Sequence, residues 1–65
     1  MQNNWDLTDR EFEVLKLLTQ GLNNEEIAKI LIIEVCTVKA HITSVFKKLG
    51  VKTRLQAVVK AFNEG

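Results

Sequence analysis

Residues 35–49 carry the side chains whose types and spacing could do chemistry in this chain. Val38, Ile42 and Val45 recur at helical steps and mark one apolar face of this segment. The other face is lined by short or cationic side chains, namely Lys39, Ala40, Thr43, Ser44 and Lys47. Small side chains allow a close approach, and ammonium and hydroxyl groups donate hydrogen bonds to base edges and phosphate oxygens. The pattern therefore favours a helix that binds a nucleic acid.

Other kinds of chemistry have little support in the 65 residues. One cysteine and one histidine exclude an internal disulfide and the usual zinc or iron–sulfur spacings. The chain offers no nucleophile beside a base, no paired carboxylates in a plausible cleft and no phosphate-binding loop. We therefore expect a protein that is not an enzyme and that holds no metal and no cofactor.

The sequence also lacks features of membrane or secreted proteins. The longest apolar run, residues 30–33, is far below the roughly 18 residues needed to span a bilayer. The N-terminus is polar and has no apolar signal core. A single cysteine is typical of a reduced, intracellular chain. We expect a cytoplasmic protein without membrane contact.

The charge of the chain is close to balanced in total but strongly divided along its length. Nine lysines and arginines oppose eight acids, so the net charge of +1 argues at first against a polyanionic partner. Residues 1–34 hold three cations and seven acids, a net charge of −4, whereas residues 35–65 hold six cations and one acid, a net charge of +5. The positive charge is therefore concentrated on the half that carries the candidate binding helix.

Three pairs of capping residues predict where helices begin. Each pair places a Thr or Asn three residues before a Glu or Gln, so that both side chains can bond to the backbone of the first turn. The pairs are Thr8 with Glu11, Asn23 with Glu26, and Thr53 with Gln56.

Glycines and a short turn predict where the helices end. Gly21 and Gly50 follow apolar helical patterns, where a left-handed C-cap residue is expected. Residues 30–38 are rich enough in β-branched side chains for a strand, but no second run could pair with it, so we predict a helix–helix turn near residues 32–34. The result is an all-α fold in which a polar lead-in, 1–6, precedes one domain, 7–63, with helices at about 9–20, 24–31, 35–49 and 54–63.

Several motifs together resemble a known family. They are Leu7-Thr8-x-Arg10-Glu11, Gly21-x-x-Asn24-x-Glu26-Ile27-Ala28, Thr37-Val38-Lys39-x-His41 and Lys48-Leu49-Gly50-Val51-x-x-Arg54-x-x-Ala57-Val58. Over about residues 7–62 the chain is similar to the LuxR-type (GerE, NarL/FixJ-like) DNA-binding domain.

This resemblance implies a fold and a function. It implies a four-helix helix-turn-helix domain that binds double-stranded DNA as a homodimer and regulates bacterial transcription in the cytoplasm, at the nucleoid. Helix 35–49 would read the major groove. Such domains usually form the output module behind a receiver or autoinducer-binding domain, although some stand alone. RNA polymerase or an attached receiver domain would then be a further partner.

The resemblance also implies roles for individual residues. The base-contact positions fall on Lys39, Ala40 and Thr43. The positions near phosphates fall on Thr37, Lys47, Lys48 and Arg54. The dimer contact is placed on Leu55, Val59 and Phe62, and the family histidine, at His41, is expected to be structural.

Some residues depart from the family pattern and leave a second hypothesis open. Glu34 stands where a capping Ser or Thr is usual, and Val35 and Cys36 replace residues that are usually polar. Val35, with Ile30 and Ile32, suggests an apolar surface near the start of the binding helix. The alternative is therefore a helical protein-interaction module that has lost DNA binding.

Two other side chains have plain structural interpretations. Trp5 is expected to cover the first helix. Cys36 is expected to be a small apolar filler rather than a redox switch, although it lies near a helix N-terminus, where a thiol is more easily ionised.

Overall fold

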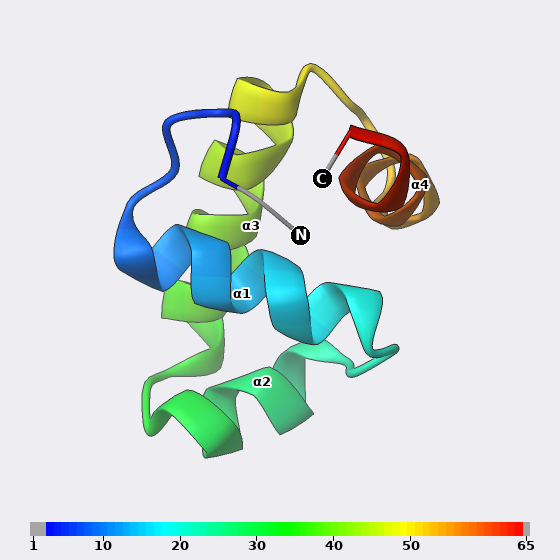
Figure 1. Ribbon diagram of the computed structural model, residues 1–65. Coiled ribbons are helices and arrows are strands. Elements are labelled where there is room, and N and C mark those ends of the chain that lie inside the picture. Colours follow the sequence, from blue (N-terminus) through cyan, green and yellow to red (C-terminus); the bar gives the residue numbers. More distant parts are fainter. Residues whose placement is uncertain (1–2, 65) are drawn as a thin grey trace.

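A computed structural model describes residues 3–64, and within them four helices and no strand are found (Figure 1). They are α1 (Asp9–Thr19), α2 (Asn24–Leu31), α3 (Val35–Leu49) and α4 (Arg54–Glu64). The predicted all-α architecture is confirmed, and the predicted ends of α1 and α4 differ from the observed ones by one residue. The first two residues of the predicted lead-in lie outside the described part of the chain.

Two of the three predicted capping boxes are complete. Oε1 of Glu11 accepts from the Thr8 N–H at 2.9 Å while Thr8 Oγ1 accepts from the Glu11 N–H at 3.2 Å. Asn23 and Glu26 exchange the same two bonds, both at 2.9 Å. These bonds satisfy backbone donors that the first turn of a helix leaves free.

The third box is only half formed, so that prediction was partly wrong. Thr53 Oγ1 accepts from the Gln56 N–H at 3.1 Å, as expected. The Gln56 side chain accepts instead from the N–H of Lys52, at 2.8 Å. The side-chain carbonyl of Gln56 thus bonds one residue further back than a capping box requires, and it holds the loop between α3 and α4.

Helix ends follow the predicted pattern at the two glycines and depart from it at the end of α2. Gly21 and Gly50 have φ of 83° and 73°, the left-handed conformation that favours glycine. The turn near residues 32–34 is confirmed, but the left-handed position there is held by Ile32, with φ of 56°. A β-branched residue in this conformation is strained, and the side chain of Ile32 is 89% exposed.

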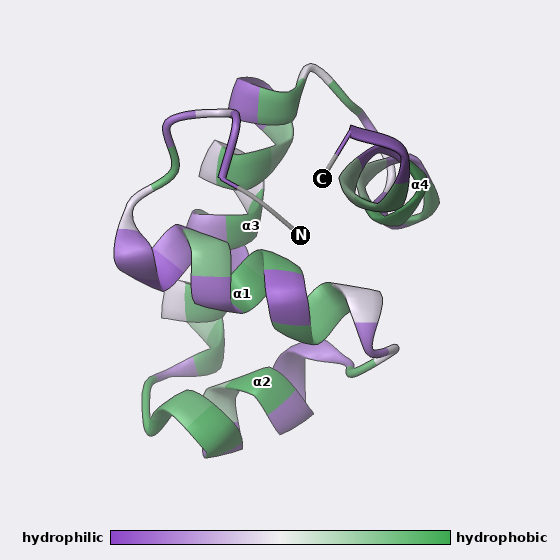
Figure 2. Cartoon of the chain, in the orientation of Figure 1, coloured by the Kyte–Doolittle hydropathy of each residue, from purple (hydrophilic) through white to green (hydrophobic). Residues whose placement is uncertain are grey.

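The core divides into two clusters that share α3 as their common wall. Val38 and Ile42 pack with residues of α1 and α2, while Val45 and Leu49 pack with residues of α1 and α4. Figure 1 shows α2 near the start of α3 and α4 near its end. Each helix carries both apolar and polar residues, as expected of helices that bury one side (Figure 2).

The N-terminal segment packs against the end of the chain. Trp5 contacts the cluster built by α1, α3 and α4, so it covers more than the first helix. The Asn4 side chain donates to the Glu64 carbonyl at 2.7 Å. The segment therefore contributes to the fold around α4.

We predict that Ile32→Asn stabilises the domain by about 1 kcal/mol, because Asn tolerates the left-handed conformation that costs an ordinary residue about 1–2 kcal/mol. Little apolar burial is lost, since Ile32 is 89% exposed. Thermal unfolding should show a rise of roughly 4–8 °C in Tm.

The matched control is Ile30→Asn. Ile30 is also exposed, but it lies within α2 and its φ is not positive. This variant should not raise Tm. A similar rise in both variants would mean that removing an exposed isoleucine, rather than relieving backbone strain, stabilises the protein.

Candidate nucleic-acid interface

The three predicted base-contact residues lie together on one exposed face of α3. Lys39, Ala40 and Thr43 are all exposed, and Lys47 continues the same face one turn further on. The Thr43 hydroxyl donates to the Lys39 carbonyl at 3.0 Å, which leaves its oxygen and methyl group free for an outside contact. A helix face of this kind presents cations beside small side chains, with its opposite face fixed in the core.

Ser44 does not belong to this face, so that part of the sequence interpretation was wrong. Its hydroxyl donates to Oε2 of Glu11 at 2.5 Å, pointing toward α1. Lys48 behaves in the same way, since its Nζ lies 2.7 Å from Oε1 of Glu11 and 3.3 Å from the Asp6 carbonyl. Both side chains therefore hold α3 against the start of α1.

Glu11 is the buried centre of this polar contact. Glu11 is only 6% exposed, and its carboxylate accepts hydrogen bonds from Lys48, from Ser44 and from the Thr8 N–H. These bonds, with that of Lys48 the strongest, lower the pKa of Glu11 from 4.5 to about 2 against the opposing effect of burial. The carboxylate is therefore charged at any ordinary pH, and it both caps α1 and orients α3.

A groove lies between the start of α2 and the start of α3, and Arg54 contributes to its lining. The groove has a volume of about 340 Å³. Arg54 comes from the first turn of α4 and donates to the Leu22 carbonyl at 3.2 Å and to the Asn24 side chain. The lining residues are Asn23, Asn24, Glu25, Val35, Lys39 and Arg54. The groove thus brings two cations from different helices together beside the exposed face of α3.

The other residues predicted to contact phosphates differ in their exposure and in their ion pairing. Lys47 is exposed, while Thr37 is half-buried. The positive charge of Lys48 is offset by its ion pair with Glu11. The sequence could not show these pairings, because Glu11 lies 37 residues from Lys48, and Arg54 lies 30 residues from Asn24.

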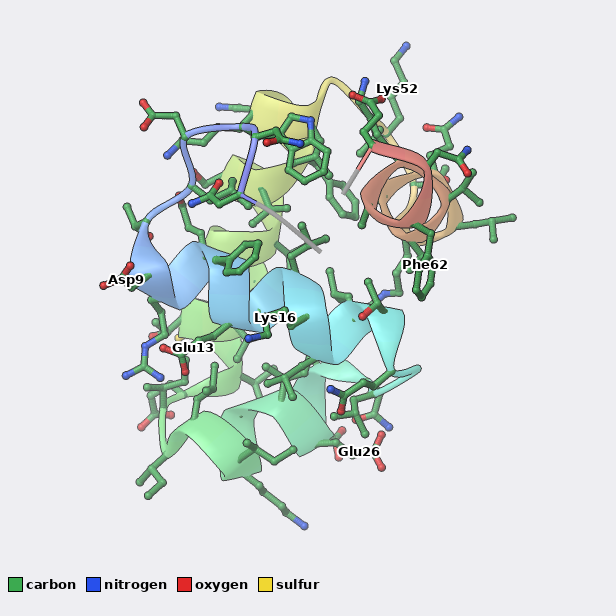
Figure 3. The ribbon with its side chains drawn as sticks, in the orientation of Figure 1. Asp9, Glu13, Lys16, Glu26, Lys52 and Phe62 are labelled. Atoms are coloured by element: carbon green, nitrogen blue, oxygen red, sulfur yellow. The ribbon has the colours of Figure 1, made fainter. Side chains whose placement is uncertain are left out.

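The predicted dimer residues form an exposed apolar stripe on α4. Leu55, Val59 and Phe62 are spaced by four and three residues, and each is exposed, Phe62 to 68% (Figure 3). Leu55 and Val59 also line an open depression of about 480 Å³ beside the loop from α3. Ala57 and Ala61 face the core instead. The stripe is therefore the outer side of a helix whose inner side is already packed.

Two residues that the sequence treated as structural or apolar, Cys36 and His41, are more exposed than expected. Cys36 is exposed rather than packed as a filler. His41 is only half-buried. Of the suggested apolar surface, Ile30 and Ile32 are exposed, whereas Val35 is half-buried against the second core cluster.

Residues 3–64 contain no group of three or more His, Cys, Asp or Glu side chains that could hold a metal ion. Each helix in this part of the chain is too short or too polar to cross a membrane.

Comparison with known proteins identifies relatives along nearly the whole chain. Residues 6–61 match the family described as bacterial regulatory proteins, luxR family. The transcriptional regulatory protein LnrK of Bacillus subtilis (strain 168) is 48% identical over 60 residues, covering 92% of this chain and 27% of LnrK. The response regulator VraR of Staphylococcus aureus (strain Mu3 / ATCC 700698) is 46% identical over 56 residues, covering 86% of this chain and 27% of VraR.

Solved structures agree with this relationship. The response regulator ChrA of a heme-sensing two-component system superposes with a TM-score of 0.87 at 38% identity, covering 97% of this chain and 31% of ChrA. The DNA-binding domain of the response regulator ComA, solved in complex with the anti-activator RapF, gives a TM-score of 0.82 at 38% identity. That match covers 85% of this chain and 95% of the ComA domain. The chain spans only 27% of the length of the curated relatives it matches.

The lowered pKa of Glu11 predicts acid sensitivity. A carboxyl group whose pKa is lower in the folded state stabilises the fold above its unfolded pKa and loses this effect as the pH falls through the folded pKa. With values of 4.5 and about 2, the free energy of unfolding should fall by about 3 kcal/mol as the pH drops from about 5 to below 2. Urea denaturation at each pH measures this change.

Glu11→Gln should be less stable at neutral pH and should lose this part of the acid dependence. The control is Glu13→Gln, which removes an exposed carboxylate from the same helix and should keep the wild-type dependence. An unchanged acid dependence in Glu11→Gln would contradict the assignment.

Proposed function

The chain belongs to the luxR family of bacterial regulatory proteins, a family of helix-turn-helix DNA-binding regulatory domains rather than of enzymes, and we propose that it regulates transcription by binding selected sequences of double-stranded DNA. The single observation that carries this proposal is the exposed face of α3. It presents Lys39, Ala40 and Thr43 together, while the opposite face of the helix is fixed in both core clusters. A helix held in this way can enter a major groove without rearrangement of the core.

We assign base recognition to the second and third turns of α3. The Lys39 ammonium can donate to the O6 and N7 acceptors of guanine. Ala40 leaves room for close approach, and Thr43 offers a methyl group to thymine or a hydroxyl oxygen to a base amine. These three side chains are our proposed base contacts.

Contacts with the DNA backbone fix the position of the domain on the duplex. Lys47 lies on the same exposed face as the base contacts, and Arg54 lines the same groove as Lys39. We assign phosphate contacts to both, and a hydroxyl contact to Thr37. We assign Lys48 mainly to the fold, because its ammonium is already paired with Glu11.

Two copies would pair through α4. The stripe of Leu55, Val59 and Phe62 is the outer, exposed side of this helix, and apolar stripes of this kind are suited to helix–helix contact. An isologous pair places two α3 helices in a two-fold relation, so the target should have dyad symmetry.

The whole protein is proposed to be a response regulator that acts in the cytoplasm, at the nucleoid. This follows from LnrK and VraR, which are a transcriptional regulatory protein and a response regulator and are several times longer than this chain. In that setting a receiver domain or RNA polymerase would be an additional partner.

The second candidate function is a protein-interaction module without DNA binding. The exposed side chains of Ile30 and Ile32 favour it. The two functions differ in their response to salt, because only DNA binding releases condensed counterions.

Selection of duplexes from a random pool, followed by a salt titration, tests the proposed function. With Lys39, Lys47 and Arg54 as the cations at the interface, log affinity should fall with log salt with a slope of about −2.7 per domain. No selected duplex, or a flat salt response, would favour the interaction module.

Lys39→Ala should weaken binding to the selected duplex by about 1–3 kcal/mol, because it removes a base contact. Fluorescence anisotropy with a labelled duplex measures the change. Lys16→Ala is the matched control, since Lys16 is an exposed lysine on α1 that lies over the Phe12 ring (Figure 3). Equal losses in the two variants would indicate a general charge effect instead of a contact.

Phe62→Glu should shift the protein, free or bound to DNA, toward the monomer, because it places a charge in the apolar stripe of α4. Sedimentation velocity over a range of concentrations measures the shift. Thr43→Glu adds the same charge on α3 and should leave the self-association of the free protein unchanged. If Phe62→Glu sediments like the wild type, the α4 interface is wrong.

A further inference from the structure

The groove that contains Lys39 and Arg54 continues into a second groove of opposite charge. The second groove has a volume of about 430 Å³ and shares Glu25 and Val35 with the first. Its lining residues are Glu25, Ala28, Lys29, Ile33, Glu34 and Val35. The two grooves therefore adjoin between α2 and α3: Lys39 and Arg54 line the first, Lys29 and Glu34 line the second, and Glu25 lies where they meet.

Glu25 and Glu34 make no capping hydrogen bond and no ion pair within residues 3–64. Glu34 is the N-cap residue of α3, but its side chain makes no capping hydrogen bond. Glu25 lies in the first turn of α2, where the capping box is completed by Glu26. The ion pairs found in residues 3–64 join Glu11 with Lys48 and Lys60 with Glu64, so they involve neither group. Both side chains are exposed.

We propose that Glu25 and Glu34 form an acidic rim that confines the DNA backbone to the Lys39–Arg54 end of this surface and lowers the affinity of a single domain for any duplex. The proposal rests on the proposed function, because it concerns the same contact with DNA. The rim would act only by repulsion, so it weakens binding that depends on phosphates alone, and it penalises docking positions in which a DNA strand crosses the second groove.

The size of the effect follows from distance and solvent. A carboxylate and a phosphate roughly 6 Å apart in water repel each other enough to raise Kd about threefold. Salt reduces this repulsion, since the Debye length falls from about 30 Å at 0.01 M to about 10 Å at 0.1 M. The effect of the rim should therefore be largest at low salt.

The experiment compares Kd values for a labelled duplex of random sequence, measured by fluorescence anisotropy at several salt concentrations. Glu34→Gln and Glu25→Gln should each lower Kd about threefold at low salt, and the double variant about tenfold. The control is Glu13→Gln, which makes the same change in net charge on α1 (Figure 3). Glu13 lines neither groove. It should change Kd by less than either rim variant.

Two results would overturn the proposal while leaving the proposed function intact. One is wild-type Kd values in both rim variants, although Lys39→Ala still weakens binding. The other is an equal gain in the Glu13 control, which would make the effect one of net charge. If the wild-type domain binds no duplex even at low salt, the proposed function fails and the rim fails with it.

A second variant separates electrostatics from folding. Glu34→Ser removes the charge and can supply the capping bond that Glu34 lacks, so the domain should be at least as stable as the wild type. It should show the same lower Kd as Glu34→Gln. If only one of the two variants binds more tightly, the change reflects the new side chain rather than the lost charge, and the rim is refuted.

Discussion

The contact of the Glu11 carboxylate with α3 is the interaction on which the geometry of this domain depends. One oxygen caps the start of α1 and pairs with Lys48, and the other accepts from Ser44. A small domain buries little apolar surface, and apolar packing specifies the rotation of a helix less sharply than directional bonds do. Directional bonds to a charged group fix the rotation of α3 about its axis. Glu11 therefore determines which face of α3 is exposed, although it is not among the proposed DNA contacts.

The position of α3 in the core has the same consequence. Its apolar residues serve two clusters in turn, Val38 and Ile42 toward α2, and Val45 and Leu49 toward α4. A helix that is anchored at both ends presents its outer side as a rigid surface. Rigid presentation matters for recognition, because a side chain that must be ordered on binding gives up part of its interaction energy. The arrangement lets 15 residues act both as the wall of the core and as the reading surface.

Local patterns in the sequence predicted the fold well, whereas contacts between distant residues could not be predicted. The bounds of α2 and α3 followed from Asn23 and Gly50, since a cap depends only on its near neighbours. Ser44 was assigned to the binding face because it is polar, and Lys48 was assigned a phosphate contact by the family resemblance. Neither the helical repeat nor the resemblance shows that α1 offers both side chains a carboxylate. Arg54 was placed near phosphates, and its bonds to the neutral oxygens of Leu22 and Asn24, which leave its charge uncompensated, depend on how the loops fold together. Only the tertiary structure shows which cations remain available.

The near-zero net charge has a physical meaning once the cations that form ion pairs are distinguished from those that do not. Lys48 and Lys60 are paired with Glu11 and Glu64, so the lysines and arginines that can serve DNA are fewer than the sequence contains. Because counterion release adds with each phosphate contact, a domain with few such cations binds duplex weakly by itself. Joining two domains adds the contributions of both to log affinity. Under the proposed pairing through α4, an event that brings two such stripes together would convert weak binding into tight binding, which would make self-association a point of control.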